Sequence, residues 1–312
     1  MNKLLIIDYH YPAYVELAKK YYPNCEVFAG DNVAAIKDKA SECDIWLGAA
    51  NLCADLLKQG VRSPRWIQSI LAGITPLLAN DLPKDYQLSR AVGVFDQLMA
   101  EYVLTYMLAH ERTVIAHYEA QNKQQWLRGE PATLHDKTVL IVGAGTIGTG
   151  VAKFLKPFGV HLLGIAHKAR AIEPFDKVGV QSDLATYVAD ADYVINLLPD
   201  TPDTHNIYNA NIFSKMKQGA VFINAGRGVS IVDDDLIAAL ANNKPALAVL
   251  DVFRTEPLPT DHPFWKVPNI VLTGHSAAMG IPSLIFDLFR HNLTHFEKQE
   301  PLIGQVDFKK GY

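Results

Sequence analysis

Three predicted strands are each followed within a few residues by a side chain that could take part in chemistry, namely Arg227, Glu256 and His275. In an open parallel sheet the carboxyl ends of the strands border one crevice, so residues far apart in sequence can meet there. A guanidinium can bind a carboxylate, and an imidazole can give a proton to a carbonyl oxygen. A neighbouring carboxylate favours the charged imidazole and orients its ring. Each residue alone could be structural, but together the three fit the reduction of a 2-oxo acid.

A glycine-rich loop could bind the nucleotide that such a reduction needs. The strand Thr138 to Val142 runs into Gly143, Gly145 and Gly148 in GxGxxG spacing, and a predicted helix follows at once. The first glycine allows a tight turn, the second lets the backbone approach a pyrophosphate, and the third lets the helix pack closely on the strand. Backbone amides would face the phosphates at Gly145, Thr146 and Ile147. The alternative, a glycine-rich turn of some other α/β protein, fits this strand and helix context less well.

The end of the next strand indicates which dinucleotide is bound. Enzymes that use NAD place an acidic residue there to bind the ribose 2′-hydroxyl. This chain instead has His167, Lys168 and Arg170 at that point and no acidic residue. Cations can pair with a 2′-phosphate, so we expect NADPH to be preferred, with NADH possible. The alternative is that the three residues are only a solvated loop.

The elements that position these residues follow from hydrophobic periodicity. In the first part of the chain, short strands are predicted at 4–7, 44–48 and 66–70, and helices between them at 11–21 and 32–40. One long amphipathic helix is predicted to begin near Gln97 and to continue through Ala120. Later strands are more strongly apolar and are predicted at 138–142, 160–165, 193–197, 221–224, 246–250 and 270–273. A last helix follows Pro282 and runs to about Glu300. Two α/β units with parallel sheets emerge.

The composition excludes several classes of protein. The 312 residues are 49% hydrophobic and carry a formal net charge of −4, with no basic face of the kind that binds nucleic acid. The cysteines Cys25, Cys43 and Cys53 lack CxxC spacing, so we expect neither disulfides nor a metal site. No apolar run is long enough for a signal peptide or a membrane span. A cytoplasmic protein with no membrane partner is therefore expected.

Beyond these arguments, the chain resembles the D-isomer-specific 2-hydroxyacid dehydrogenases over nearly its whole length, most closely the glyoxylate/hydroxypyruvate reductase A branch. The resemblance rests on motifs spread along the sequence: MAEYV at 99–103, GAGTIG at 143–148, LLPDTPDT at 197–204, NAGRG at 224–228, DVF at 251–253, EPLP at 256–259, HPFW at 262–265 and GHSA at 274–277. Together these motifs are highly specific to that family.

The resemblance implies two Rossmann-like, doubly wound parallel-sheet domains. A nucleotide-binding domain at 98–282 would be inserted into a flavodoxin-like substrate domain formed by 1–97 and 283–312. Arg227, Glu256 and His275 would be catalytic, with Arg227 and His275 also contacting cofactor and substrate. Further cofactor contacts are implied at Leu198, Pro199, Thr204, Ala225 and Asp251. The resemblance also implies a homodimer built on the long helix that starts near Met99.

The family binds the substrate carboxylate with a glycine-rich turn, and the matching residues here are Ala72, Gly73 and Ile74. Amides of Gly73 and Ile74 would hold the carboxylate, and closure of the two domains would exclude water. Thr75 stands where relatives have Asp, and Leu71 where many have Gly, which affects substrate choice rather than hydride chemistry. Trp46, Asn51 and Trp265 are further candidates for the pocket wall, or else core aromatics and a helix cap.

The function expected from the sequence is NADPH-dependent reduction of glyoxylate to glycolate and of hydroxypyruvate to D-glycerate, with His275 as the proton donor. One alternative is a dehydrogenase for a bulkier 2-oxo acid. Another is a non-catalytic dinucleotide-sensing module, which the joint presence of Arg227, Glu256 and His275 disfavours. A formate dehydrogenase-like enzyme is a third, but those enzymes pair the histidine with Gln rather than Glu.

Overall fold

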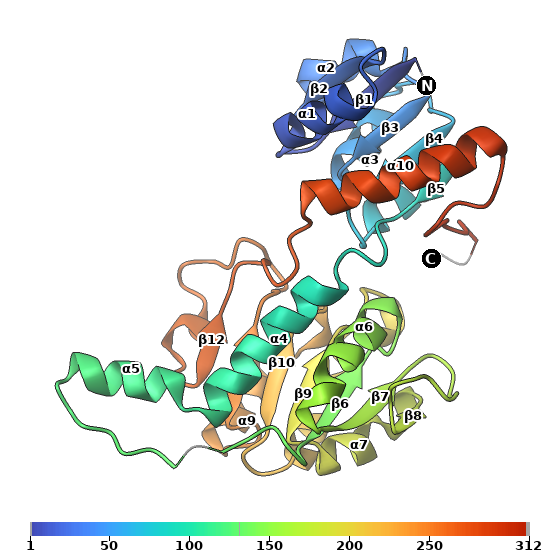
Figure 1. Ribbon diagram of the computed structural model, residues 1–312. Coiled ribbons are helices and arrows are strands. Elements are labelled where there is room, and N and C mark those ends of the chain that lie inside the picture. The colour runs from blue at the N-terminus through green and yellow to red at the C-terminus, as the bar shows by residue number, and fades with distance from the viewer. Residues whose placement is uncertain (1, 131, 310–312) are drawn as a thin grey trace. The chain divides into compact units, whose positions relative to one another are not determined.

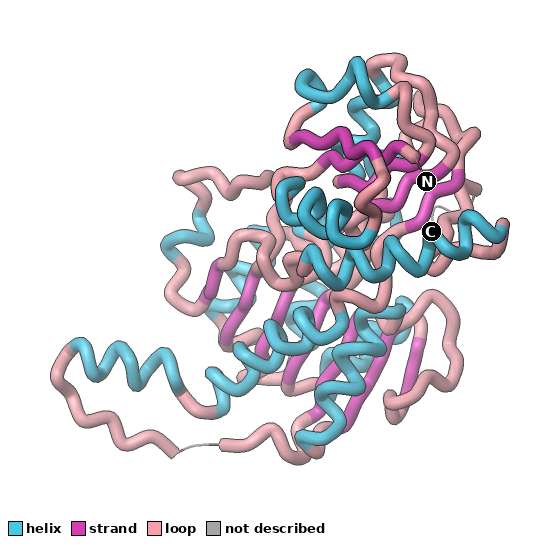
Figure 2. Tube along the Cα trace, turned by 45° about the horizontal axis from the view of Figure 1, so that its top comes forward, coloured by secondary structure: helices cyan, strands magenta, loops and turns pink. Residues whose placement is uncertain are grey.

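Neighbouring strands run parallel throughout the two β-sheets of the chain (Figure 1). The computed structural model describes residues 2–130 and 132–309. Contacts between Cα atoms divide the chain into unit 1, Met1–Val94 with Gly280–Tyr312, and unit 2, Phe95–Met279. Figure 2 shows that strands and helices alternate along the trace in both units, which is the α/β class expected from the sequence.

Unit 1 has a five-stranded sheet in the order β2-β1-β3-β4-β5, the flavodoxin-like arrangement. Its strands are β1 Lys3–Ile7, β2 Glu26–Gly30, β3 Ile45–Gly48, β4 Trp66–Ser69 and β5 Gln87–Ser89. Its helices are α1 Tyr11–Tyr21, α2 Val33–Ala40, α3 Ala50–Lys58 and α10 Pro282–Lys298.

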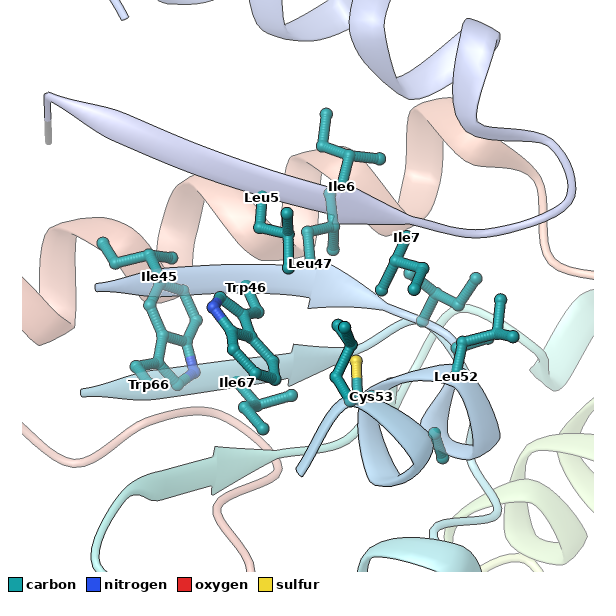
Figure 3. Close-up of a cluster of buried hydrophobic side chains, with 14 of the residues drawn as sticks. Leu5, Ile6, Ile7, Ile45, Trp46, Leu47, Leu52, Cys53, Trp66 and Ile67 are labelled. Carbon is teal, nitrogen blue, oxygen red and sulfur yellow. The ribbon is translucent and has the colours of Figure 1, made fainter. Parts of the chain in front are cut away.

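The core of unit 1 explains why its central strands are largely apolar. Leu5 and Ile6 are neighbours on β1 and both are fully buried, because helices cover both faces of a parallel sheet (Figure 3). Trp66 stacks on Phe289 of α10 with the ring centroids 5.3 Å apart. The amide of Asn292, also on α10, donates to Gln68 Oε1 at 2.8 Å. These contacts attach the C-terminal helix to the sheet formed by the first ninety residues.

Unit 2 has a seven-stranded sheet in the order β12-β11-β10-β9-β6-β7-β8. The strands are β6 Thr138–Val142, β7 His161–Ile165, β8 Lys177–Gly179, β9 Tyr193–Asn196, β10 Val221–Asn224, β11 Leu247–Leu250 and β12 Ile270–Leu272. The helices are α4 Asp96–Glu111, α5 Val114–Asn122, α6 Thr146–Leu155, α7 Leu184–Asp190, α8 Ala210–Lys215 and α9 Asp233–Ala241.

Alternate residues of each central strand in unit 2 supply two separate cores. On β6, Val139 and Ile141 pack with α4 and α6, whereas Leu140 and Val142 pack with α7, α8 and α9. In Figure 1, α4 and α6 lie together on one face of this sheet. The unit is therefore doubly wound, as the sequence predicted. None of the helices in the described chain is both long and apolar enough to cross a membrane.

The prediction of one continuous helix from Gln97 to Ala120 is wrong. The chain forms α4 and α5 as two helices separated at Thr113, whose backbone has φ of 50°. That left-handed conformation cannot continue a right-handed helix. Three β-branched residues in a row, Thr113, Val114 and Ile115, also weaken helix propensity at this point. In both Figure 1 and Figure 2, α5 extends away from the sheet of unit 2.

Three strands were not predicted, and each lies at the edge of its sheet: β2, β5 and β8. Central strands are buried on both faces and have neighbours on both sides, which gives them continuous apolar runs. The edge strands here are shorter or more exposed, as in β8, where Lys177 is exposed and only Gly179 is buried. Their sequences therefore carry a weak periodic signal.

Candidate active site

The chain reverses its direction across the sheet between β6 and β9, and the glycine-rich loop lies at this reversal. From β6 the chain winds outward through β7 and β8, and then returns to β9 on the other side. Gly143 has φ of 109°, and a Cβ there would lie 2.9 Å from the carbonyl of Leu197. A Cβ on Gly148 would lie 2.2 Å from the Gly143 carbonyl oxygen. Only glycine fits at these two positions, and ligands of open parallel sheets bind at such reversals.

The start of α6 has the properties of a pyrophosphate site. Gly145 is the N-cap, and a Cβ added to it would meet nothing within 4 Å, so the backbone is open to a ligand. Thr146 and Ile147 follow in the first helical turn, where amides have no partner within the helix and the helix dipole favours anions. The residues at this loop therefore fit a dinucleotide.

Three basic side chains follow β7, as the sequence predicted. His167, Lys168 and Arg170 are all exposed, and none forms an ion pair with a residue that the structure describes. The backbone leading into them is fixed by a 3.0 Å hydrogen bond from the Ala166 amide to Gly179. The charges of Lys168 and Arg170 are thus free to pair with an external anion, to which His167 can donate a hydrogen bond.

The loop after β9 lies between the glycine-rich loop and the loop of Arg227. Thr204 is buried, and its hydroxyl donates to the carbonyl of Pro199 at 2.7 Å. A Cβ on Gly226 would lie 2.8 Å from the carbonyl oxygen of Leu198. The side chain of Thr204 therefore shapes the loop rather than pointing outward, and Leu198 contacts the loop that carries Arg227.

A buried polar network supports the backbone of Arg227. The Ser230 hydroxyl donates to the Arg227 carbonyl at 2.7 Å, and the Asn224 side-chain amide donates to the same oxygen at 3.3 Å. Asn196 donates to both Asn224 and Ser230 at 2.8 Å. Ala225, two residues before Arg227, is buried. Asn196 and Asn224 are the last residues of otherwise apolar strands, and that placement was the signal by which the sequence could have revealed them.

The guanidinium of Arg227 is half-buried and has no acidic partner among the described residues. One of its nitrogens, Nη1, donates to the Gly226 carbonyl at 2.6 Å, and this is the hydrogen bond that holds it. A permanently charged group without a counterion in such a place can bind an external carboxylate.

His275 and Glu256 form the hydrogen-bonded pair that their sequence positions predicted. Nδ1 of His275 lies 2.7 Å from Glu256 Oε2, while Oε1 of the same carboxylate accepts from the Phe253 amide at 2.9 Å. The His275 side chain is 54% exposed, and Nε2 makes no hydrogen bond with a described residue. Holding Nδ1 leaves Nε2 available for proton transfer.

The Arg227 loop and the Glu256 loop are in direct contact. A Cβ on Gly228 would lie 2.0 Å from the backbone carbon of Phe253, so glycine is required for the two loops to meet. β10, β11 and β12 are adjacent and in register at Asn224, Leu250 and Leu272. The three candidate catalytic residues therefore follow the carboxyl ends of three neighbouring strands.

The backbone of His275 is held in an uncommon conformation. Its φ is 52°, in the left-handed region that non-glycine residues rarely occupy and that costs about 1 kcal/mol or more. Its amide donates to the Asp251 carbonyl at 2.7 Å. The Asp251 carboxylate accepts from the Ser276 and Ala277 amides at 2.8 and 3.0 Å. Asp251, 2% exposed, thus fixes the His275 turn with its own backbone and side chain.

Comparison with known proteins agrees with this geometry. Residues 104–277 match the family model for the NAD-binding domain of D-isomer specific 2-hydroxyacid dehydrogenases. Glyoxylate/hydroxypyruvate reductase A of Serratia proteamaculans is 36% identical over 216 residues, which are 69% of each chain. A family member from Aeromonas salmonicida has a TM-score of 0.91 at 34% identity, covering 98% of this chain and 99% of its own.

This chain belongs to the D-isomer specific 2-hydroxyacid dehydrogenase family. It is therefore an NAD(P)-dependent oxidoreductase. A further solved structure, the NADPH-dependent glyoxylate/hydroxypyruvate reductase of Sinorhizobium meliloti in complex with NADP and sulfate, aligns over 100% of both chains. Its TM-score is 0.86, at 29% identity.

Arg254 is a residue of this dehydrogenase that was not predicted from the sequence. Its guanidinium donates to the carbonyl of Ile231 and to the side chain of Asn206, and its Nη2 lies 3.3 Å from the Val229 carbonyl. Arg254 therefore ties the segment after Arg227 to the loop that carries Glu256. No sequence motif distinguished it from an exposed surface arginine.

In unit 1, the turn after β4 contains the residues predicted to bind the substrate carboxylate. Ser69 fixes the turn, because its hydroxyl bonds both the amide and the carbonyl of Leu71 at 3.1 and 3.2 Å. The amides of Ala72, Gly73 and Ile74 make no hydrogen bond with any described residue. Three consecutive free amides can hold an anion.

The weaker candidates for the pocket wall differ in their surroundings. Trp46 is fully buried, with its indole donating to the Cys43 carbonyl at 3.2 Å, so it is a core residue. Asn51 is exposed on α3, and Trp265 is 54% exposed with its indole donating to Pro259.

Among the described residues, no His, Cys, Asp and Glu side chains gather as a metal-binding set.

Proposed function

We propose that this dehydrogenase reduces small 2-oxo acids with NADPH, converting glyoxylate to glycolate and hydroxypyruvate to D-glycerate. The observation that carries the proposal is the 2.7 Å pair of His275 and Glu256, with the exposed ring and Arg227 on the loops that follow the strands on either side of β11. The relatives from Serratia proteamaculans and Sinorhizobium meliloti, both named glyoxylate/hydroxypyruvate reductases, support the choice of substrates.

Each residue has a distinct part in the proposed reaction. When bound at the glycine-rich loop, NADPH would supply the hydride for the carbonyl carbon of the substrate. Arg227 binds the substrate carboxylate, and His275 gives a proton to the carbonyl oxygen from Nε2. Glu256 holds Nδ1, which fixes the orientation of the ring. Charge that develops on the oxygen is met by Arg227 and His275 together.

The proposal also includes the turn in unit 1 and the loop after β9. The free amides of Ala72, Gly73 and Ile74 are proposed as further ligands of the substrate carboxylate. Leu198, Pro199, Thr204, Ala225 and Asp251 are proposed to border the cofactor. Among these, Thr204 and Asp251 act through the backbone that they shape, since their polar atoms are bonded within the chain.

The preference for NADPH over NADH is attributed to the loop after β7. Lys168 and Arg170 would pair with the 2′-phosphate, and His167 would add a third donor. These side chains have no counterion among the described residues, and no acidic residue stands where a ribose 2′-hydroxyl would be bound. Solved family members complexed with NADP support this assignment.

We further propose that the protein is a cytoplasmic homodimer. α5 and the segment after it expose a group of large apolar side chains: Val114, Ile115, Tyr118, Trp126 and Leu127. Trp126 is 94% exposed, and apolar groups of this size on a projecting arm mark protein interfaces. A second copy of the chain is the expected partner, which sedimentation analysis would test. The proposed location rests on the composition, since Cys25, Cys43 and Cys53 lack the spacing of a disulfide framework.

A panel of 2-oxo acids assayed by the loss of NADPH absorbance tests the proposed function. Glyoxylate and hydroxypyruvate should give the highest kcat/KM, ahead of pyruvate, 2-oxo-isocaproate and phenylpyruvate. NADPH should be preferred to NADH with each substrate. A higher kcat/KM for phenylpyruvate than for glyoxylate would reject the substrate assignment, and no turnover with any acid would reject the reductase itself.

A further inference from the structure

The geometry points to Tyr102 and Thr273 as positioning residues that brace the Asp251 carboxylate and, through it, the loop that carries His275. This inference rests on the proposed function, in which His275 is the proton donor. The link runs from α4, far away in sequence, to the tip of β12, and neither residue touches the reacting atoms.

A chain of hydroxyl hydrogen bonds connects the three residues. The Thr273 hydroxyl donates to Asp251 Oδ1 at 2.6 Å, so its proton is already used. The Tyr102 hydroxyl lies 2.8 Å from the same Thr273 oxygen and must therefore be the donor of that bond. Burial raises the pKa of Tyr102, so the phenol keeps its proton over any assay range. The direction of donation is thus from Tyr102 to Thr273 to Asp251.

The braced carboxylate is the one that fixes the His275 turn. Its remaining bonds go to the amides of Ser276 and Ala277, and the Asp251 carbonyl accepts from the His275 amide. These bonds hold His275 at φ of 52°, a conformation the residue would leave without support. Removing the Tyr102 donor should weaken the Asp251 arrangement and let His275 relax away from the geometry that proton transfer needs.

α4 offers a matched control for this role in Tyr106. The two rings lie edge to face with centroids 4.9 Å apart, and both are half-buried on the same helix. The hydroxyl of Tyr106 makes no hydrogen bond with a described residue. Tyr102→Phe and Tyr106→Phe therefore remove the same atom from neighbouring places, but only the first removes a bond to Thr273.

The experiment measures kcat with glyoxylate, the Kd of NADPH and amide hydrogen exchange in the cofactor-free protein. For Tyr102→Phe we expect about a three- to tenfold lower kcat, as for loss of one neutral hydrogen bond, with the Kd of NADPH changed less than about twofold. The segment 270–279 should exchange faster. Tyr106→Phe should match the wild type in all three measurements. Thr273→Val should lower kcat by about 10- to 100-fold, and Thr273→Ser, which keeps the hydroxyl, should restore most of it.

The outcomes separate this inference from the proposed function. Wild-type protein without turnover would reject the proposed function, while faster exchange of 270–279 in Tyr102→Phe would still support the brace. An active wild type with unchanged kcat and exchange in Tyr102→Phe would overturn the inference alone. Equal losses in the two Tyr→Phe variants would also overturn it, because they would show a packing effect of α4. A Thr273→Ser variant as impaired as Thr273→Val would do the same.

Discussion

Two loops at the carboxyl ends of strands in the unit 2 sheet are built in opposite ways. The loop after β12 is bonded at nearly every residue, with Thr273, Ser276 and Ala277 all tied to the Asp251 carboxylate. The loop after β7 carries three charged or ionisable side chains, and none of them has an ion-pair partner among the described residues. One loop is braced from within, while the other presents unpaired charge.

The difference reflects what each loop has to do. A proton donor must hold one geometry before the substrate arrives, because small displacements of a reacting group are costly to the rate. A phosphate-binding cation needs only to reach its partner, and its side chain can order when the ligand supplies the opposite charge. The braced loop should therefore control kcat, and the open loop should control the affinity for NADPH.

The largest effect on kcat is expected from the removal of His275 or Arg227. His275→Ala should lower kcat by about 10²- to 10⁴-fold, because the proton donor is lost. Arg227→Ala should lower it by about 10²- to 10³-fold, because the substrate carboxylate and the developing charge lose their cation. Steady-state kinetics would measure these losses of kcat. NADPH titration should give each variant a Kd of NADPH close to that of the wild type. His135→Ala removes another exposed histidine paired with an acid, at 2.9 Å from Asp136, and should change neither value. Turnover near the wild-type level in His275→Ala would contradict the assignment.

A smaller loss of kcat is expected for Glu256→Gln. The amide cannot hold Nδ1 of His275 as a carboxylate does, and loss of a charge-assisted hydrogen bond corresponds to about a 10- to 100-fold lower kcat. The Kd of NADPH should stay within about twofold of the wild type. An unchanged kcat would show that the 2.7 Å pair is not used in the reaction. A much higher Kd of NADPH would show that Glu256 contributes to cofactor binding, as the loop after β7 is proposed to do.

The smallest effect on kcat, close to none, is expected at the open loop. Lys168→Ala with Arg170→Ala should raise the KM of NADPH by about 10- to 100-fold and leave that of NADH almost unchanged. Added salt should reduce the difference in the KM of NADPH between the wild type and this double variant, because screening weakens exposed charges. Lys215→Ala with Lys266→Ala, which removes the same charge from two other exposed positions, is the control. Equal losses for NADPH and NADH would show that the preference arises elsewhere.

The elements that the sequence predicted well are the central strands, which must be apolar because both of their faces are buried. Thr138–Val142 and Val221–Asn224 are strands with the predicted bounds, because they are buried on both faces and apolar except at one end, at Thr138 and Asn224. The long helix was predicted without its break at Thr113, since apolar periodicity continues through the break. The edge strands β2, β5 and β8 were missed because pairing on one side leaves a weaker pattern.

By itself, the sequence determined the nucleotide loop and the residues at the strand tips. The φ of 109° at Gly143 and the contact of Gly148 with the Gly143 carbonyl lie within a single strand–turn–helix unit. Strand order alone brings Arg227, Glu256 and His275 to the carboxyl ends of neighbouring strands. What holds them there depends on contacts between segments far apart in the chain. The bonds from Tyr102 to Thr273 and from Arg254 to Ile231 join segments 171 and 23 residues apart. Such contacts leave no local pattern, because each partner alone is an ordinary polar residue, and folding creates the hydrogen bond between them.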